Sequence, residues 1–224
     1  NLVNKIRSSG FNVYELSMTE ENLTDKNLMH SEWLGVTQKK DAFDCIEILK
    51  TFKTQWLIVD HYGLDKEWQL RLKRYCRKIM VIDDLGDRRH DCDLLLDQNL
   101  GSTASKYHNL VNQNCKILIG PDYALLRTEF SLWRDYSLQR RENKLDLDTI
   151  LVSLGGIDPD NFTEKILKQL AECKLKAEIK IQVVVGENSP HLKKIQKQAS
   201  KMPFKTEVKI GVNNMAELMA KADL

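Results

Sequence analysis

Short apolar runs alternate along this chain with segments whose apolar residues recur at helical spacing. Runs typical of strands buried on both faces lie at 13–16, 56–60, 79–83, 94–97, 117–120, 150–154, 179–186 and 208–211. Helical spacing is found at 39–52, 65–75, 124–141 and 215–220. Strands that alternate with helices pair in parallel through right-handed crossovers. The pattern therefore predicts an α/β fold with parallel sheets.

A charged segment divides this series into two parts. Residues 140–148, RRENKLDLD, have the composition of an exposed linker. We expect a first domain over 1–140 that ends in a long basic helix, a linker over 141–148 and a second domain over 149–224. The chain opens inside a helical pattern and closes where a strand pattern starts. We therefore expect an excerpt of a longer protein in which both domains are truncated.

The strand expected at 150–154 ends in a glycine pair, Gly155 and Gly156. Asp158 follows as a favoured N-cap, and Pro159 is tolerated at a first helical position. A turn of this kind lies at the carboxyl edge of a parallel sheet, where bare backbone and helix N–H groups let a phosphate approach. A tight turn that binds nothing needs the same glycines. The pattern leaves both interpretations open.

Polar residues follow three of the expected strands, namely Asp60-His61-Tyr62, Asp83-Asp84 and Asp97-Gln98-Asn99. The carboxyl ends of parallel strands meet at the edge where α/β folds bind ligands, so these residues are predicted to converge. Asp and Asn at such ends also cap helices and close turns. His61 is a candidate general base, although a lone histidine is more often structural.

Metal sites have weak support in the sequence. The pair Asp83-Asp84 is able to hold a metal against a diphosphate, but no second ligand cluster accompanies it. His90, Cys92 and Asp93 lack a partner pair at the spacing of a zinc site. We expect neither a metal nor another cofactor.

Composition and charge narrow the classes of partner. The net charge of +2, from 34 basic and 32 acidic residues, gives no sign of a nucleic-acid partner. No apolar run approaches the ~20 residues of a membrane span. Five cysteines without a CxxC pair are typical of reduced cytoplasmic thiols. We expect a cytoplasmic protein with no nucleic-acid or membrane partner, and the sequence leaves the oligomeric state open.

Five segments resemble, in the same order, one known family. They are WLIVDHYGLD, VIDDLGDRRHDCDLLLDQN, GPDYALLRTEF, LVSLGGIDPDNFT and MAELMAKADL, within a resemblance that runs from about Trp33 to Leu224. The family is that of the UDP-sugar hydrolases of pseudaminic acid biosynthesis, with the named activity UDP-2,4-diacetamido-2,4,6-trideoxy-β-L-altropyranose hydrolase. The resemblance implies two Rossmann-like domains of GT-B type, the second of which binds the nucleotide. It also implies metal-independent attack of water at the anomeric carbon of a UDP-sugar.

The resemblance also implies site residues. Tyr62 matches an active-site tyrosine and is the expected catalytic residue, and Gly155-Gly156 matches the turn at the cleft. Substrate contacts are expected from His61, Asp83, Asp84, Asn99, Gly155, Gly156 and Asp158. The family's glycine-rich turn with its presumed catalytic histidine, part of the first βα unit, would precede Asn1. Its uridine-binding stretch would follow Leu224. A glycosyltransferase of the same fold and a non-catalytic nucleotide-sugar-binding protein are the alternatives.

Overall fold

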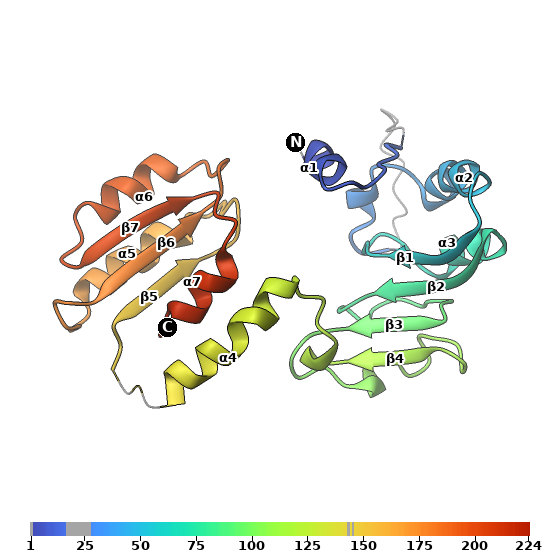
Figure 1. Cartoon of the computed structure of the whole chain (residues 1–224). Coiled ribbons are helices and arrows are strands. Elements are labelled where there is room, and N and C mark those ends of the chain that lie inside the picture. The colour runs from blue at the N-terminus through green and yellow to red at the C-terminus, as the bar shows by residue number, and fades with distance from the viewer. Residues whose placement is uncertain (1, 17–27, 143, 145) are drawn as a thin grey trace. The chain divides into compact units, whose positions relative to one another are not determined.

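The computed structural model describes residues 2–16, 28–142, 144 and 146–224 (Figure 1). The chain forms two compact units, residues 1–125 and 126–224. Each unit contains a sheet whose strands all pair in parallel. The predicted α/β class is confirmed. None of the helices in the described ranges has the length and apolar character needed to cross a membrane.

A four-stranded parallel sheet of order β1-β2-β3-β4 forms the centre of the first unit. The strands are β1 (Thr54–Val59), β2 (Cys76–Ile82), β3 (Leu94–Asp97) and β4 (Lys116–Ile119). The α-helices are α1 (Leu2–Ser8), α2 (Gln38–Leu49) and α3 (Lys66–Leu72). Short 3-10 helices are η1 (Ser31–Leu34), η2 (Lys73–Tyr75), η3 (Ala104–Tyr107) and η4 (Pro121–Tyr123).

The register of this sheet sets its carboxyl ends level with one another. Val59 lies opposite Val81, and Ile82 lies opposite Leu96. The core beneath is closed by fully buried residues of the helices and strands, including Ala42, Leu72, Ile79 and Leu95. Asp65 starts α3 by accepting a hydrogen bond from the Glu67 backbone N–H at 2.8 Å. The loops after β1, β2 and β3 consequently leave the sheet side by side.

The second unit has a three-stranded parallel sheet of order β5-β6-β7. Its strands are β5 (Thr149–Ser153), β6 (Lys180–Val185) and β7 (Lys205–Ile210). Its helices are α4 (Thr128–Glu142), α5 (Phe162–Glu172), α6 (Leu192–Ala199) and α7 (Met215–Lys221). In Figure 1, α5 and α7 lie on opposite faces of the sheet. The core is filled by the fully buried side chains of Leu167, Ile181, Val183 and Ile195.

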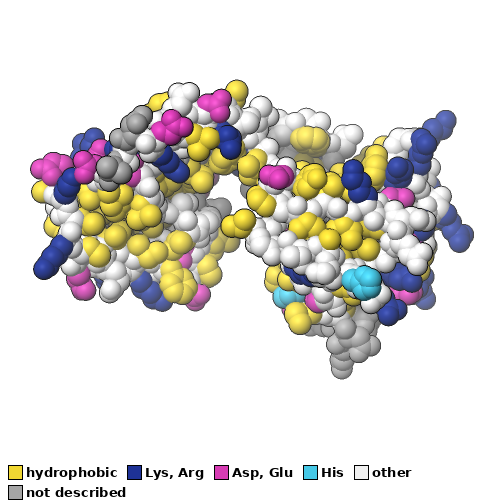
Figure 2. All heavy atoms as spheres, turned by 90° about the horizontal axis from the view of Figure 1, so that it is seen from below, with side chains coloured by type: hydrophobic (Ala, Val, Ile, Leu, Met, Phe, Trp, Pro, Cys, Tyr) yellow, Lys and Arg dark blue, Asp and Glu magenta, His cyan; other side chains and the backbone are white. Residues whose placement is uncertain are grey.

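Apolar side chains also reach the surface of the second unit. Figure 2 shows them gathered on the face of this unit that is turned toward the viewer. Exposed hydrophobic residues of this unit include Leu132, Tyr136, Leu138, Met219 and Leu224. A cavity of about 370 Å³ lies among Arg141, Leu151, Ser153, Met215, Met219, Ala222 and Leu224. Its apolar lining residues come from β5, from α7 and from the residues directly after α7.

Helix α4 belongs to the second unit, because α4 packs against α7. Arg140 of α4 donates from Nε to the Ala220 carbonyl at 3.2 Å and forms an ion pair with Asp223. Asp223 in turn accepts hydrogen bonds from the backbone N–H groups of Asp148 and Thr149, both at 2.9 Å. The boundary therefore falls at residue 125 rather than at 140. Arg140 and Asp148, which belong to the charged stretch predicted as a linker, take part in these contacts instead.

Two predicted elements differ from the structure. The strand predicted over 13–16 does not form, since no strand partner contacts this segment in the described part of the chain, and Tyr14 is exposed. The helix predicted to start at Pro159 starts at Phe162 instead. Asp158 and Asn161 both have positive φ, 45° and 54°, which is incompatible with a right-handed helix. The polar stretch at 17–27 lies outside the described residues.

Candidate functional site

The predicted convergence of strand ends at the edge of the first sheet is confirmed. A cavity of about 310 Å³ lies there, lined by Asp60, Tyr62, Ile82, Asp83, Asp84, Leu96, Gln98, Asn99 and Leu125. Most of the lining comes from the loops after β1, β2 and β3, which the level register brings together. Ile82 and Leu96 are strand residues, and Leu125 follows η4. The Gln98 side chain accepts a hydrogen bond from the Leu125 backbone N–H at 2.8 Å. All of the residues that line the cavity therefore belong to the first unit.

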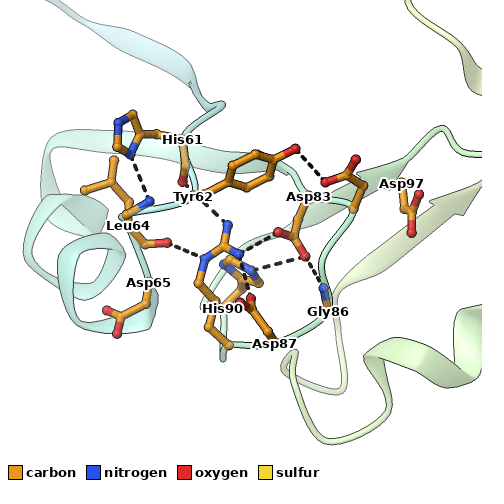
Figure 3. Close-up of polar contacts among 12 residues, drawn as sticks. His61, Tyr62, Leu64, Asp65, Asp83, Gly86, Asp87, His90 and Asp97 are labelled. Atoms are coloured by element: carbon orange, nitrogen blue, oxygen red, sulfur yellow. Dashed lines mark hydrogen bonds and ion pairs between the residues drawn. The ribbon is translucent and has the colours of Figure 1, made fainter. Parts of the chain in front are cut away.

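A hydrogen-bonded trio forms the polar wall of this cavity. The Tyr62 hydroxyl donates to Asp84 Oδ1 at 2.6 Å, and Asn99 Nδ2 donates to Asp84 Oδ2 at 3.0 Å (Figure 3 labels Tyr62). The hydrogen bond to Asp84, helped by burial, raises the pKa of Tyr62 to about 12. Tyr62 therefore keeps its proton at neutral pH. It is equipped to donate a hydrogen bond and not to act as a base.

Asp83 has a different role from Asp84, although both line the cavity. Its carboxylate is buried and forms an ion pair with Arg88, Oδ1 to Nη1 at 2.7 Å, and its Oδ2 accepts from the Gly86 N–H at 2.9 Å. Arg88 is buried as well. Both oxygens of Asp83 are engaged within the protein. These contacts give Asp83 a structural role, and the substrate contact predicted there stays a prediction.

Arg88 also holds the loop that carries Tyr62. Its Nε donates to the Leu64 carbonyl at 2.9 Å, and its Nη2 lies 3.5 Å from the His61 carbonyl. The guanidinium carbon lies 5.7 Å from the centre of the Tyr62 ring, within the range of a cation–π contact. The sequence interpretation missed Arg88. Its only local signal is a basic pair shortly after Asp83-Asp84.

Asp97 anchors the loop that carries Asn99. Its buried carboxylate accepts from the Ser102 hydroxyl at 2.7 Å, the Tyr107 hydroxyl at 3.0 Å and Lys106 Nζ at 3.2 Å. The Asn99 backbone N–H adds a fourth hydrogen bond at 3.1 Å. Burial alone would raise the pKa of Asp97, but these hydrogen bonds lower it below its usual value. The carboxylate is therefore ionised and fixed, which positions Asn99 beside Asp84.

His61 does not line the cavity. Its ring points away from Tyr62 and Asp83 in Figure 3, and its Nδ1 accepts a hydrogen bond from the Gly63 backbone N–H at 3.0 Å. This short-range bond closes the turn after β1 and fixes the imidazole there. The structure therefore separates His61 from the other strand-end residues. The alternative of a structural histidine fits this placement, and the substrate contact predicted at His61 stays a prediction.

An aromatic pair that sequence reasoning missed lies beside Tyr62. The ring centres of His30 and Trp33 are 5.7 and 5.8 Å from that of Tyr62, and 4.5 Å from each other. Trp33 is 60% exposed. About thirty positions separate these residues from Tyr62, so no local pattern links them. A tryptophan next to a polar stretch was the available signal.

In the second unit, the backbone requires glycine at Gly155 and Gly186 but not at Gly156. Gly155 has φ 80°, and a side chain at Gly156 would meet no atom within 4 Å. A Cβ on Gly186, at the end of β6, would lie 2.1 Å from the Gly156 carbonyl oxygen. Gly155 is therefore needed for its backbone angles and Gly186 for close approach. The N–H groups of Gly155 and Gly156 donate to no acceptor within the described ranges.

Asp158 lies before the start of α5 at Phe162, and its side chain caps the N-terminus of this helix. Its Oδ1 accepts from the Phe162 N–H and its Oδ2 from the Thr163 N–H, both at 2.9 Å. Burial would raise the pKa of this carboxyl, but the hydrogen bonds from Thr163 and Phe162 lower it. The carboxylate already occupies the start of α5. The predicted substrate contact at Asp158 and a phosphate on the α5 N–H groups are therefore both disfavoured.

Comparisons with known proteins agree with the sequence resemblance. No protein-family model matches the chain. The chain is 31% identical over 186 residues to UDP-2,4-diacetamido-2,4,6-trideoxy-β-L-altropyranose hydrolase of Campylobacter jejuni, a match that covers 82% of this chain and 63% of that protein. It is 29% identical over 208 residues to the spore coat polysaccharide biosynthesis protein SpsG of Bacillus subtilis, covering 90% of this chain and 59% of SpsG. The chain thus spans about three fifths of the length of these two relatives.

A solved structure shows the same fold. The crystal structure of MurG from Acinetobacter baumannii matches with a TM-score of 0.53 over 98% of this chain and 57% of MurG, at 9% sequence identity. Such a low identity shows the fold alone. The two Rossmann-like units are accordingly of GT-B type. The predicted resemblance is confirmed, and the chain is a sequence relative of the UDP-2,4-diacetamido-2,4,6-trideoxy-β-L-altropyranose hydrolase.

Proposed function

We propose that this protein hydrolyses a UDP-linked diacetamido-trideoxy sugar and releases UDP and the free sugar, in pseudaminic acid or related surface-glycan biosynthesis. The observation that carries the proposal is the trio of Tyr62, Asp84 and Asn99 in the cavity of the first unit. Two of the segments that carry the family resemblance supply this trio. Relatedness to a hydrolase of such a substrate supports the reaction class.

The charges of the cavity suit the sugar better than the diphosphate. Asp60 and Asp84 present carboxylates there, and the Asp60 side chain has no hydrogen-bond partner among the described residues. Two anionic groups repel a diphosphate but accept hydrogen bonds from hydroxyl and amide N–H groups. The Tyr62 and Asn99 side chains add neutral groups. We assign the sugar to this cavity.

In the second unit, we propose that a phosphate lies at the turn of Gly155 and Gly156. The free N–H groups of these two residues are the donors available there, since Asp158 already occupies the start of α5. Backbone donors that need no reorganisation stabilise the charge that develops on a leaving diphosphate. In the proposed reaction, water attacks the anomeric carbon and the bond to the diphosphate oxygen breaks. UDP departs with the electron pair of that bond.

The complete natural protein is expected to release UDP from its UDP-sugar in the absence of any acceptor, and EDTA is not expected to stop it. The first expectation follows from water as the nucleophile, and the second from the metal-independent reaction that the resemblance implies. Release of UDP, followed by chromatography with and without added sugar or lipid acceptors, measures both. Turnover only with an acceptor would favour a glycosyltransferase. Binding of UDP-sugar without any turnover would favour the binding protein.

A further inference from the structure

The function proposed above gives no role to His30 and Trp33, the aromatic pair beside Tyr62. Trp33 lies in η1 with 60% of its surface exposed, and its ring packs against Tyr62 and His30. A large aromatic side chain that stays this exposed next to a cavity wall is typical of a binding surface. Tyr62 is shared by the two surfaces, because its hydroxyl meets Asp84 while its ring meets Trp33.

The backbone holds this pair in a defined place. His30 and Gly35 flank η1 with positive φ, 61° and 72°, and the Trp33 N–H donates to the His30 carbonyl at 3.1 Å. The His30 carbonyl also sits against the turn after β1, where a Cβ on Gly63 would lie 3.1 Å from it. A left-handed conformation at a non-glycine residue persists only where the surroundings fix it. The pair is thus seated on the Tyr62 loop.

Polar and apolar surfaces therefore meet at Tyr62. On one side lie the hydrogen-bonding groups of Asp84 and Asn99, and on the other the ring faces of His30 and Trp33. A fully hydroxylated sugar satisfies the first surface only. A sugar with acetamido groups offers amide N–H donors to the carboxylates and methyl groups to the rings. Burying a methyl group on an aromatic face is favourable, whereas burying a hydroxyl group there is not.

We propose that Trp33, supported by His30, contacts the acetamido methyl groups of the bound sugar and makes the site prefer acylamino sugars to hydroxylated ones. This inference rests on the proposed function, since it places the sugar in the cavity of the first unit. Trp33 is then a residue that determines specificity. On this proposal Trp33 contacts the sugar and not the UDP part of the ligand.

Calorimetric titration of the complete protein with UDP-N-acetylglucosamine, UDP-glucose and UDP tests this, because the two sugars differ in one acetamido group. Wild type is expected to bind the acetamido sugar about 10-fold more tightly than UDP-glucose. Trp33→Ala is expected to lose most of this preference while its affinity for UDP stays unchanged. Trp33→Phe should restore part of it, because a ring face returns.

Trp56→Ala is the matched control. Trp56 is 46% exposed on β1, and its ring lies beside Lys78 rather than Tyr62, so this substitution is expected to leave the preference unchanged. An unchanged preference in Trp33→Ala would overturn the inference and leave the proposed function intact. An equal loss of affinity for all three ligands would also overturn it, since Trp33 would then only support the fold. If wild type bound none of the three, the proposed function would fail and the inference with it.

Discussion

Replacing Arg88 by methionine is expected to lower the free energy of unfolding of the first unit by about 3–5 kcal/mol. The substitution leaves the Asp83 carboxylate buried without its cation, and Arg88 and Asp83 have side-chain exposures of only 4% and 0%. It also removes the hydrogen bond to the Leu64 carbonyl. An uncompensated buried charge costs far more than a lost surface ion pair. Urea denaturation followed by circular dichroism measures the change.

Arg89→Met is the matched control, since Arg89 is exposed and carries the same charge. It is expected to change stability by less than about 0.5 kcal/mol. The double variant Asp83→Leu with Arg88→Met removes both charges and is expected to recover part of the loss. If Arg88→Met were as stable as wild type, the buried Asp83 carboxylate would not need Arg88 as its counter-charge.

Replacing Tyr62 by phenylalanine is expected to lower kcat about 10²-fold, because the hydroxyl that holds Asp84 in place beside the bound sugar is lost, an effect of the size seen when one polar group is removed from an active site. The ring, with its contacts to Trp33 and Arg88, remains, and only the hydroxyl that meets Asp84 is lost. Affinity for UDP should stay within about twofold, because the interaction acts mainly in the transition state. Steady-state kinetics and calorimetry of the same preparation give both quantities.

Tyr136→Phe serves as the control for this variant, because Tyr136 lies on α4 of the second unit and is 44% exposed. It should keep wild-type turnover. Full activity of Tyr62→Phe would instead reduce Tyr62 to a structural tyrosine. The cavity would then lose its expected catalytic residue, and Asp84 would be the next group to replace.

The strands were predictable because they are buried on both faces. The apolar runs that end at Asp60, Asp83 and Asp97 form β1, β2 and β3 with ends shifted by only a few residues. The predictions were wrong where contacts between distant parts of the chain, rather than the local sequence, determine the structure. The run at 13–16 has apolar residues but no strand beside it in the described part of the chain. The start of α5 moved because Asp158 and Asn161 adopt positive φ, which their sequence permits but does not require.

The candidate site was predictable only in outline. Parallel order brings the strand-end residues to one edge, so Tyr62, Asp84 and Asn99 follow from the sequence together with the sheet order. The direction of a side chain does not follow, and His61 shows this, because a single hydrogen bond within its own turn directs the ring away. Arg88 reaches Leu64 and Tyr62, and Trp33 reaches Tyr62, over 24 or more positions of the chain. Such contacts leave no local pattern.

The fate of solvent oxygen tests the central claim most directly. Hydrolysis of the UDP-sugar by the complete protein in water enriched in oxygen-18, followed by mass spectrometry of both products, reports which bond breaks. Free sugar incubated alone in the same water corrects for exchange of its anomeric hydroxyl. Attack at the anomeric carbon predicts labelled sugar and unlabelled UDP. Label in the UDP would show attack at phosphorus and would contradict the account.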